Sequence, residues 1–224
     1  MKKNVILLLA CLLAFGASSQ VIMSESRPAA QVLQLPAHVT KPGIEDFAAA
    51  YLNAISASDD PLESRAVVLM RNNRGESQVS TDEMAMSIDR SKGYARFEWM
   101  VQFDQIIEMC YWNRSDGKKL LGVCTTSDHE NSGVSVTLAF YLLDATHHKL
   151  MFNKTITDKV TQSLKRVKHT TGANPISIAV KLPRQGKDIS VTRWVIHEDE
   201  DYAEDPMYYE LKWNGKSFNA ATRR

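Results

Sequence analysis

Two cysteines, Cys110 and Cys124, lie in strand-like runs on either side of a Ser-Asp-Gly-Lys turn at residues 115–118. Each is seven residues from Gly117, so a three-residue loop centred on that glycine places them opposite each other in a hairpin. Opposed residues of a non-hydrogen-bonded antiparallel pair have Cα atoms about 4.5 Å apart, at the short end of disulfide geometry. The spacing predicts a disulfide between Cys110 and Cys124. Two reduced, buried thiols remain the alternative, because a two-residue turn shifts the register.

The sequence gives less support to a nucleophilic cysteine or a metal site than to a disulfide. A reactive thiol needs a lowered pKa and solvent access, whereas both cysteines lie in runs with the apolar character of half-buried strands. The adjacent pair His147 and His148 occupies a turn, and neighbours on an extended chain point to opposite sides. Six carboxylates crowd residues 198–205, but they lack the spacing of a calcium-binding loop. We therefore predict no catalytic residues, no metal and no cofactor.

Carbohydrate chemistry is the remaining candidate. Glycoside hydrolysis needs two carboxylates, one on each side of a sugar bond, and the chain offers Glu98, Asp104 and Glu108 close together in sequence. Several aromatic side chains could stack on sugar rings, although strand alternation must bury about half of them. These aromatic residues are Tyr111, Trp112, Tyr208, Tyr209 and Trp213.

The elements that position these residues are predicted from hydrophobic periodicity. One helix is expected over residues 44–55, where apolar residues follow the spacing of a single helical face. A second is expected over residues 155–168 with Thr157 as N-cap. Runs that are β-branched or of period two predict strands at residues 65–70, 84–89, 94–103, 106–113, 120–126, 134–143, 150–152, 176–182, 189–197, 207–213 and 216–218.

This order predicts an α+β fold, a mainly antiparallel sheet of meanders with one or two helices packed on it. Two stretches look alike, because the Gly117-Lys118 turn leads to Phe152 much as the Gly186-Lys187 turn leads to Phe218. Two similar helix-plus-sheet lobes, or repeated turns of an ordinary meander, would both give this pattern. The expected divisions are an extended arm or linker over 20–43, a unit over 44–153, and a unit over 154–224 that could be continuous with it.

The N-terminus predicts export. Lys2 and Lys3 precede about eleven apolar residues and a small-residue exit, which is the pattern of a signal peptide over residues 1–19. The apolar run is shorter than the ~20 residues of a membrane-spanning helix. Lipidation at Cys11 is a minor alternative. Removing this segment leaves 25 basic and 26 acidic side chains, a balance that argues against nucleic-acid binding.

Residues 111–121, 140–144 and 209–218 carry turn and aromatic patterns that resemble small exported proteins of uncharacterised function from Bacteroidetes-type bacteria. The resemblance spans about residues 75–220. It implies a periplasmic or surface location and an antiparallel α+β fold, and it transfers no catalytic residues.

These patterns favour an exported, non-catalytic binding or assembly module of the cell envelope, whose partner is a protein or a glycan. No transmembrane segment is expected after signal removal. Two alternatives remain open: an envelope hydrolase acting on carbohydrate through a carboxylate pair, and an inhibitor-like protein that uses the acidic loop at 198–205.

Overall fold

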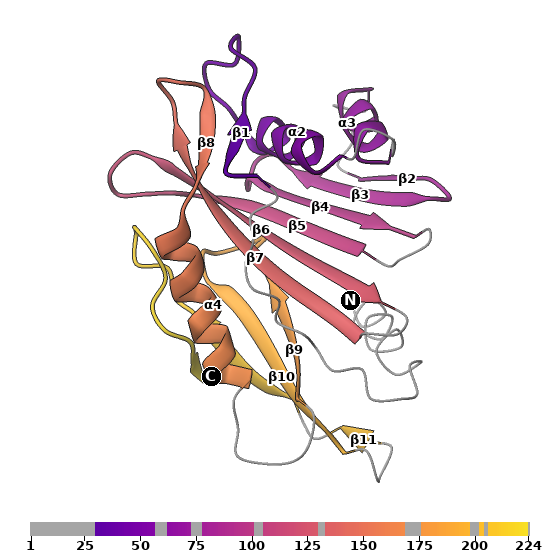
Figure 1. The fold of residues 1–224 in the computed structure, drawn as a ribbon, viewed down its shortest axis with the longest axis vertical. Helices are drawn as coiled ribbons and strands as arrows, with labels where there is room; N and C mark the ends of the chain where they lie inside the picture. The colour runs from indigo at the N-terminus through magenta and orange to yellow at the C-terminus, as the bar shows by residue number, and fades with distance from the viewer. Residues whose placement is uncertain are drawn as a thin grey trace.

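Two antiparallel sheets form the centre of this α+β protein, as a computed structural model shows (Figure 1). The structure describes residues 30–56, 62–72, 78–100, 105–129, 133–168, 176–197, 202–203 and 206–223. The predicted fold class is confirmed. No helix within these ranges has the length and apolar character needed to cross a membrane.

The larger sheet has eight strands in the order β1-β8-β7-β6-β5-β4-β3-β2. From β2 to β8 each strand pairs with its successor in the chain, so this part is one continuous meander. Its strands are β1 (Val32–Gln34), β2 (Gln78–Ser80), β3 (Met84–Asp89), β4 (Tyr94–Trp99), β5 (Gln105–Asn113), β6 (Lys119–His129), β7 (Gly133–Asp144) and β8 (Lys149–Phe152).

The smaller sheet has five strands built around β10 (Ile189–His197). This strand pairs with β9 (Ile176–Lys181), with β12 (Met207–Leu211) and, at its end, with β11 (Tyr202–Ala203). A short strand, β13 (Thr222–Arg223), pairs with β12. The meander predicted for the C-terminal part is therefore present.

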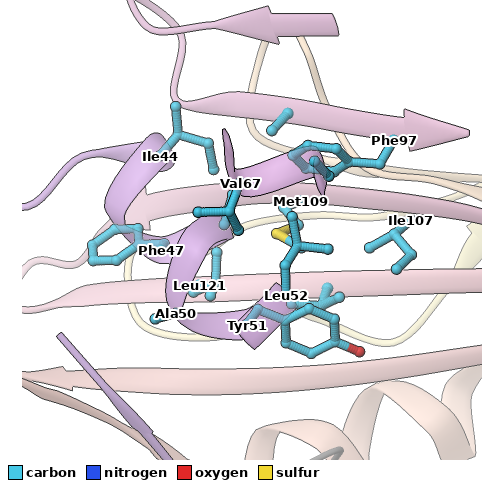
Figure 2. Packing of buried hydrophobic residues seen from close by; sticks show 14 of the residues in the cluster. Ile44, Phe47, Ala50, Tyr51, Leu52, Val67, Phe97, Ile107, Met109 and Leu121 are labelled. Carbon is cyan, nitrogen blue, oxygen red and sulfur yellow. The ribbon is translucent and has the colours of Figure 1, made fainter. Parts of the chain in front are cut away.

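The larger sheet is covered on both faces, which gives the fold its layers (Figure 1). Helices α2 (Ile44–Ile55) and α3 (Leu62–Asn72) pack on one face, where Phe47, Leu52 and Val67 meet Ile107 and Met109 (Figure 2). The smaller sheet and α4 (Lys154–Lys168) cover the other face. Because successive residues of a strand point to opposite faces, the odd-numbered residues of β5 face the helices and the even-numbered ones face the smaller sheet.

The boundary expected between residues 153 and 154 falls at the start of α4. Residues on both sides of it share one hydrophobic cluster, in which Val160 and Leu164 of α4 join Phe140 of β7 and Val191 of β10. The two predicted units thus bury their apolar surfaces against each other.

The strand predicted at residues 65–70 is wrong, since these residues belong to α3. Ala66, Val67 and Met70 are buried whereas Val68 is 53% exposed, which is the pattern of a helix face rather than of strand alternation. The two valines suggested a strand, but β propensity is weak and packing of this segment beside α2 overrides it.

Part of the extended arm or linker predicted over residues 20–43 lies within the described residues. Residues 32–34 form β1, which pairs antiparallel with β8 at the edge of the larger sheet. Leu33 and Leu35 are buried, so this segment is part of the core. The sequence pattern did not indicate β1, because the segment contains three prolines and the strand is only three residues long.

Two further details differ from prediction. Helix α4 begins at Lys154, and the Asn153 side chain accepts a hydrogen bond from the Ile156 N–H at 3.0 Å, so Asn153 and not Thr157 caps it. Thr157 is instead buried, and its hydroxyl accepts a hydrogen bond from the Phe140 N–H at 3.0 Å. The strand expected over 216–218 is reduced to one bridge between Trp213 and Phe218.

The two stretches that look alike in sequence form meanders of the same order, β5-β6-β7-β8 and β9-β10-β12. The hairpin that opens each meander has a glycine with positive φ, Gly117 at 79° and Gly186 at 80°. The second stretch ends differently, because its last predicted strand is the single bridge. A duplication stays a prediction that this common strand order supports.

Matched substitutions in α3 test its orientation. Val67→Ala should lower the free energy of unfolding by about 1–2 kcal/mol, because a buried CH₂ is worth about 0.8 kcal/mol. Val68→Ala makes the same change at an exposed position and should alter stability by less than about 0.5 kcal/mol. Urea unfolding of both variants measures the difference, and equal losses would contradict the helical assignment.

Candidate functional site

A pocket of about 210 Å³ lies where the β3–β4 turn, the end of β5, the β9–β10 turn and Trp213 come together. Its floor is buried, since Cys110 and Trp112 belong to the core between the sheets. Exposed polar residues form its rim. The side chains that line the pocket include Ser91, Lys92, Trp112, Asn113, Lys187 and Trp213.

Aromatic rings build one wall of this pocket. The Trp112 and Trp213 rings are stacked, with centroids 5.8 Å apart and planes 29° apart. Phe218 packs edge-on to Trp112 at 5.0 Å and lies 5.1 Å from Trp213. Trp112 is 4% exposed whereas Trp213 is half-buried, so Trp213 is the ring that reaches solvent.

Hydrogen bonds fix the loop that carries Trp213. The Trp213 N–H donates to Asp188 Oδ1 at 2.8 Å. The turn that follows lies against the β5–β6 hairpin, where the Ser115 N–H donates to the Gly215 carbonyl at 2.8 Å and Arg114 Nη1 donates to the Lys216 carbonyl at 2.7 Å. The last two bonds join residues about 100 positions apart in the sequence, and together the three bonds fix the loop beside the pocket.

The two lysines of the rim come from turns that are each attached to β5. The indole N–H of Trp112 donates to the Lys187 carbonyl at 2.8 Å. The Tyr111 N–H donates to the carbonyl of Gly93, the residue after Lys92, at 3.1 Å. Gly93 has φ 65°, and a Cβ there would lie 2.5 Å from the Tyr111 ring, so this close approach requires glycine. Both cationic turns are therefore anchored to adjacent residues of one strand.

The side chains described at the rim carry more positive than negative charge. Asp89 lies beside Lys92 and Arg184, with its carboxylate 3.9 Å from the Lys92 ammonium and 3.5 Å from the Arg184 guanidinium. A hydrogen bond from the Ser91 hydroxyl, at 2.7 Å, lowers the pKa of Asp89 and keeps it ionised. One acid thus faces two bases there, and Lys187 adds a further positive charge to the lining of the pocket.

A second polar cluster centres on Glu108, which is 7% exposed between the sheets. Its carboxylate accepts hydrogen bonds from the Tyr94 hydroxyl at 2.7 Å and the Leu182 N–H at 3.3 Å, and it lies 3.5 Å from the Arg96 guanidinium. The same guanidinium binds Glu98 at 3.0 Å. Burial is the main cause that raises the pKa of Tyr94, so this phenol stays protonated and donates.

Two of the three candidate carboxylates, Glu98 and Glu108, thus lie beside one arginine, Arg96, and neither lines the aromatic pocket. Glu98 lines a shallow groove of about 290 Å³ beside β2, β3 and β4, together with Arg96. Glu108 is enclosed by its own hydrogen-bond partners, so a substrate would have to displace them to reach it. The third predicted carboxylate, Asp104, lies outside the described residues.

The register predicted for the cysteine hairpin is wrong. Cys110 pairs with Gly122, and Cys124 pairs with Glu108, so the cysteines are diagonal neighbours rather than opposed. Both are free thiols, and the structure does not contain the predicted disulfide. The turn is centred one residue earlier than expected, on Asp116 rather than Gly117, since Asn113 is opposite Lys119 and the Arg114 N–H is bonded to the Lys118 carbonyl. Burial raises the pKa of both thiols, which keeps them protonated.

The remaining sequence candidates are scattered. His147 lies in the β7–β8 turn, where it contacts Asp144 at 2.8 Å. Tyr208 is 53% exposed on β12 and does not line the aromatic pocket. The acidic loop lies outside the described residues except for residues 202–203, which form β11. Among described residues, no group of three or more His, Cys, Asp or Glu could hold a metal ion.

Sequence reasoning identified Trp112 and Trp213 but missed Lys92 and Lys187. Both lysines lie beside turn glycines, Gly93 and Gly186, and the turns were predicted. That they surround one pocket depends on how the two sheets pack, which no local pattern indicates.

No protein-family model, curated protein or solved structure matches this chain.

The state of the cysteines can be tested by alkylation. In the folded protein we expect Cys110 and Cys124 to resist iodoacetamide at pH 8, because both are buried and their raised pKa values keep them from forming thiolates. After unfolding in urea without reductant, mass spectrometry should show both alkylated. A mass two hydrogens lower, with neither thiol labelled, would demonstrate the disulfide instead.

The Glu108 cluster predicts unequal effects from two carboxylates that share Arg96. Glu108→Ala should destabilise the protein by about 2–4 kcal/mol, because it leaves the buried Tyr94 hydroxyl and Leu182 N–H unsatisfied at about 1–3 kcal/mol each. Glu98→Ala removes a side chain that is 42% exposed and should cost less than about 1 kcal/mol. Chemical unfolding distinguishes them, and comparable losses would refute the structural role of Glu108.

Proposed function

We propose that this protein is an exported, non-catalytic binding module of the cell envelope, which binds a sugar ring of an envelope glycan in the pocket beside Trp213. The observation that carries the proposal is the assembly of a stacked tryptophan pair and a polar rim around one pocket, from three separate turns and the end of β5.

The lining of the pocket suits a sugar. A pyranose ring has an apolar face of C–H groups, which can lie on the half-buried Trp213 ring. Its hydroxyls need nearby donors and acceptors, which the Asn113 amide and the Ser91 hydroxyl supply at the rim. Small-ligand sites generally combine such an apolar surface with a few orienting polar groups.

The size of the pocket limits the ligand. Its volume of about 210 Å³ is below the roughly 300–1,000 Å³ of pockets that enclose drug-sized molecules. One ring therefore fits, and further rings of a chain would extend over the rim. This favours recognition of a chain end or a branch.

Recognition is a better match to this pocket than hydrolysis. Glycoside hydrolysis needs two carboxylates placed across the scissile bond, and the charged side chains that line the pocket are both lysines. The export part of the proposal rests on the signal-peptide pattern of residues 1–19.

Trp213 gives the direct test. Trp213→Ala should weaken binding of the best ligand from an envelope-glycan panel by at least about tenfold, because stacking on the half-buried Trp213 ring is lost. Trp213→Phe keeps an aromatic face and should retain most of the affinity, which guards against a general folding defect. Calorimetric titration measures both.

Tyr208→Ala is the matched control, since it removes an exposed aromatic ring outside the pocket and should leave affinity unchanged. Binding that survives Trp213→Ala, or that fails equally in Tyr208→Ala, would reject this site. Failure of the wild-type protein to bind any glycan would reject the proposed function.

A further inference from the structure

We propose that the sugar bound beside Trp213 is anionic, carrying a carboxylate or a phosphate that the ammonium groups of Lys92 and Lys187 recognise. This inference rests on the proposed function and adds the chemical class of its ligand.

The charge of the lining is the first argument. Both ionised side chains that line the pocket are cationic, and they come from turns on different sheets. Within the described part of the chain, Lys187 makes no ion pair and is exposed at the rim. A neutral sugar would leave this charge without a partner.

Nearby acidic side chains compete only to a limited extent with a ligand for the two lysine ammonium groups. Asp89 accepts hydrogen bonds from the Ser91 hydroxyl at 2.7 Å and the Lys92 backbone N–H at 3.1 Å, and it lies 3.5 Å from the Arg184 guanidinium. The Lys92 ammonium is at the outer limit of an ion pair, 3.9 Å away. Asp188 uses one carboxylate oxygen to accept the Trp213 N–H. The ammonium groups therefore retain donors for a ligand, and a lysine ammonium has three.

The backbone positions of both lysines are fixed before any ligand arrives. The carbonyl of Lys187 is held by the Trp112 indole, and the carbonyl of Gly93, next to Lys92, is held by the Tyr111 N–H. Their side chains remain flexible, so each acts as a point charge rather than as a planar fork. Such charges attract carboxylate and phosphate alike.

The expected size of the preference for an anionic sugar follows from the solvent exposure of the two lysines. Ion pairs at a solvated rim are worth a factor of about two to five each. Two lysines together should favour an anionic sugar over its neutral counterpart by about tenfold at low ionic strength. Added salt should reduce this preference, because exposed charges are screened over about 10 Å at 0.1 M.

The experiment titrates the full chain with methyl glucoside, methyl glucuronoside and glucose 6-phosphate at low and high salt. We expect either anionic sugar, or both, to bind about tenfold more tightly than methyl glucoside at low salt. A preference for the glucuronoside identifies the carboxylate as the recognised group, and a preference for glucose 6-phosphate identifies the phosphate.

Lysine substitutions distinguish the contribution of charge to sugar binding from the contribution of stacking on Trp213. The Lys92→Gln/Lys187→Gln double variant should lose the anionic preference, so that the glucuronoside and glucose 6-phosphate bind it no more tightly than methyl glucoside does. Lys181→Gln makes the Lys→Gln change once, at an exposed position on β9 outside the pocket, and should retain the preference.

The two proposals fail differently. Equal affinity of the wild-type protein for neutral and anionic sugars, or a preference that survives the double lysine variant, would overturn the anionic inference and leave the proposed function standing. Absence of binding to all sugars, including the glycan panel, would overturn both.

Discussion

Burial of the larger sheet on both faces is the constraint on which this structure depends. Strands β5, β6 and β7 place alternate side chains against the helices and against the smaller sheet, so the central positions of these strands are mostly apolar or small. Gly122 of β6 leaves room for large rings on the neighbouring strands of the same face, because a Cβ there would lie 2.7 Å from the Trp112 ring of β5 and 3.0 Å from the Phe140 ring of β7. Each face needs its own cover, and the α2–α3 pair and the smaller sheet supply one each.

The same burial determines what the polar groups between the sheets can do. Glu108 is tolerated there because Tyr94, Arg96 and the Leu182 N–H satisfy its carboxylate, and the Leu182 bond also connects the two sheets. The adjacent thiols stay protonated in this environment, since burial raises their pKa values. The buried cluster thus connects the two sheets. Side chains that can contact a ligand from solvent lie at the periphery of the core.

The proposed site lies at that periphery, where the hairpins of the two sheets extend past the shared core. Trp112 links the two regions, because its ring packs on Phe140 and Phe218 in the interior while its N–H holds the turn of Lys187. A ligand that stacks on Trp213 would therefore rest on a rigid platform. Loops on a rigid scaffold are where binding sites commonly occur.

The sequence by itself determined the α+β class, the helix at 44–55, the long strands and the glycine turns, because periodicity and left-handed turn positions are local properties. It misassigned α3, where two β-branched residues outweighed a helical face, and it shifted the cysteine hairpin by misplacing the turn. Only the tertiary structure decided that Cys110 and Cys124 are diagonal free thiols, that Glu108 is enclosed, and that Lys92, Lys187 and Trp213 share a pocket. These outcomes depend on strand register and on the packing of one sheet over another, and both are set by contacts between residues far apart in the chain.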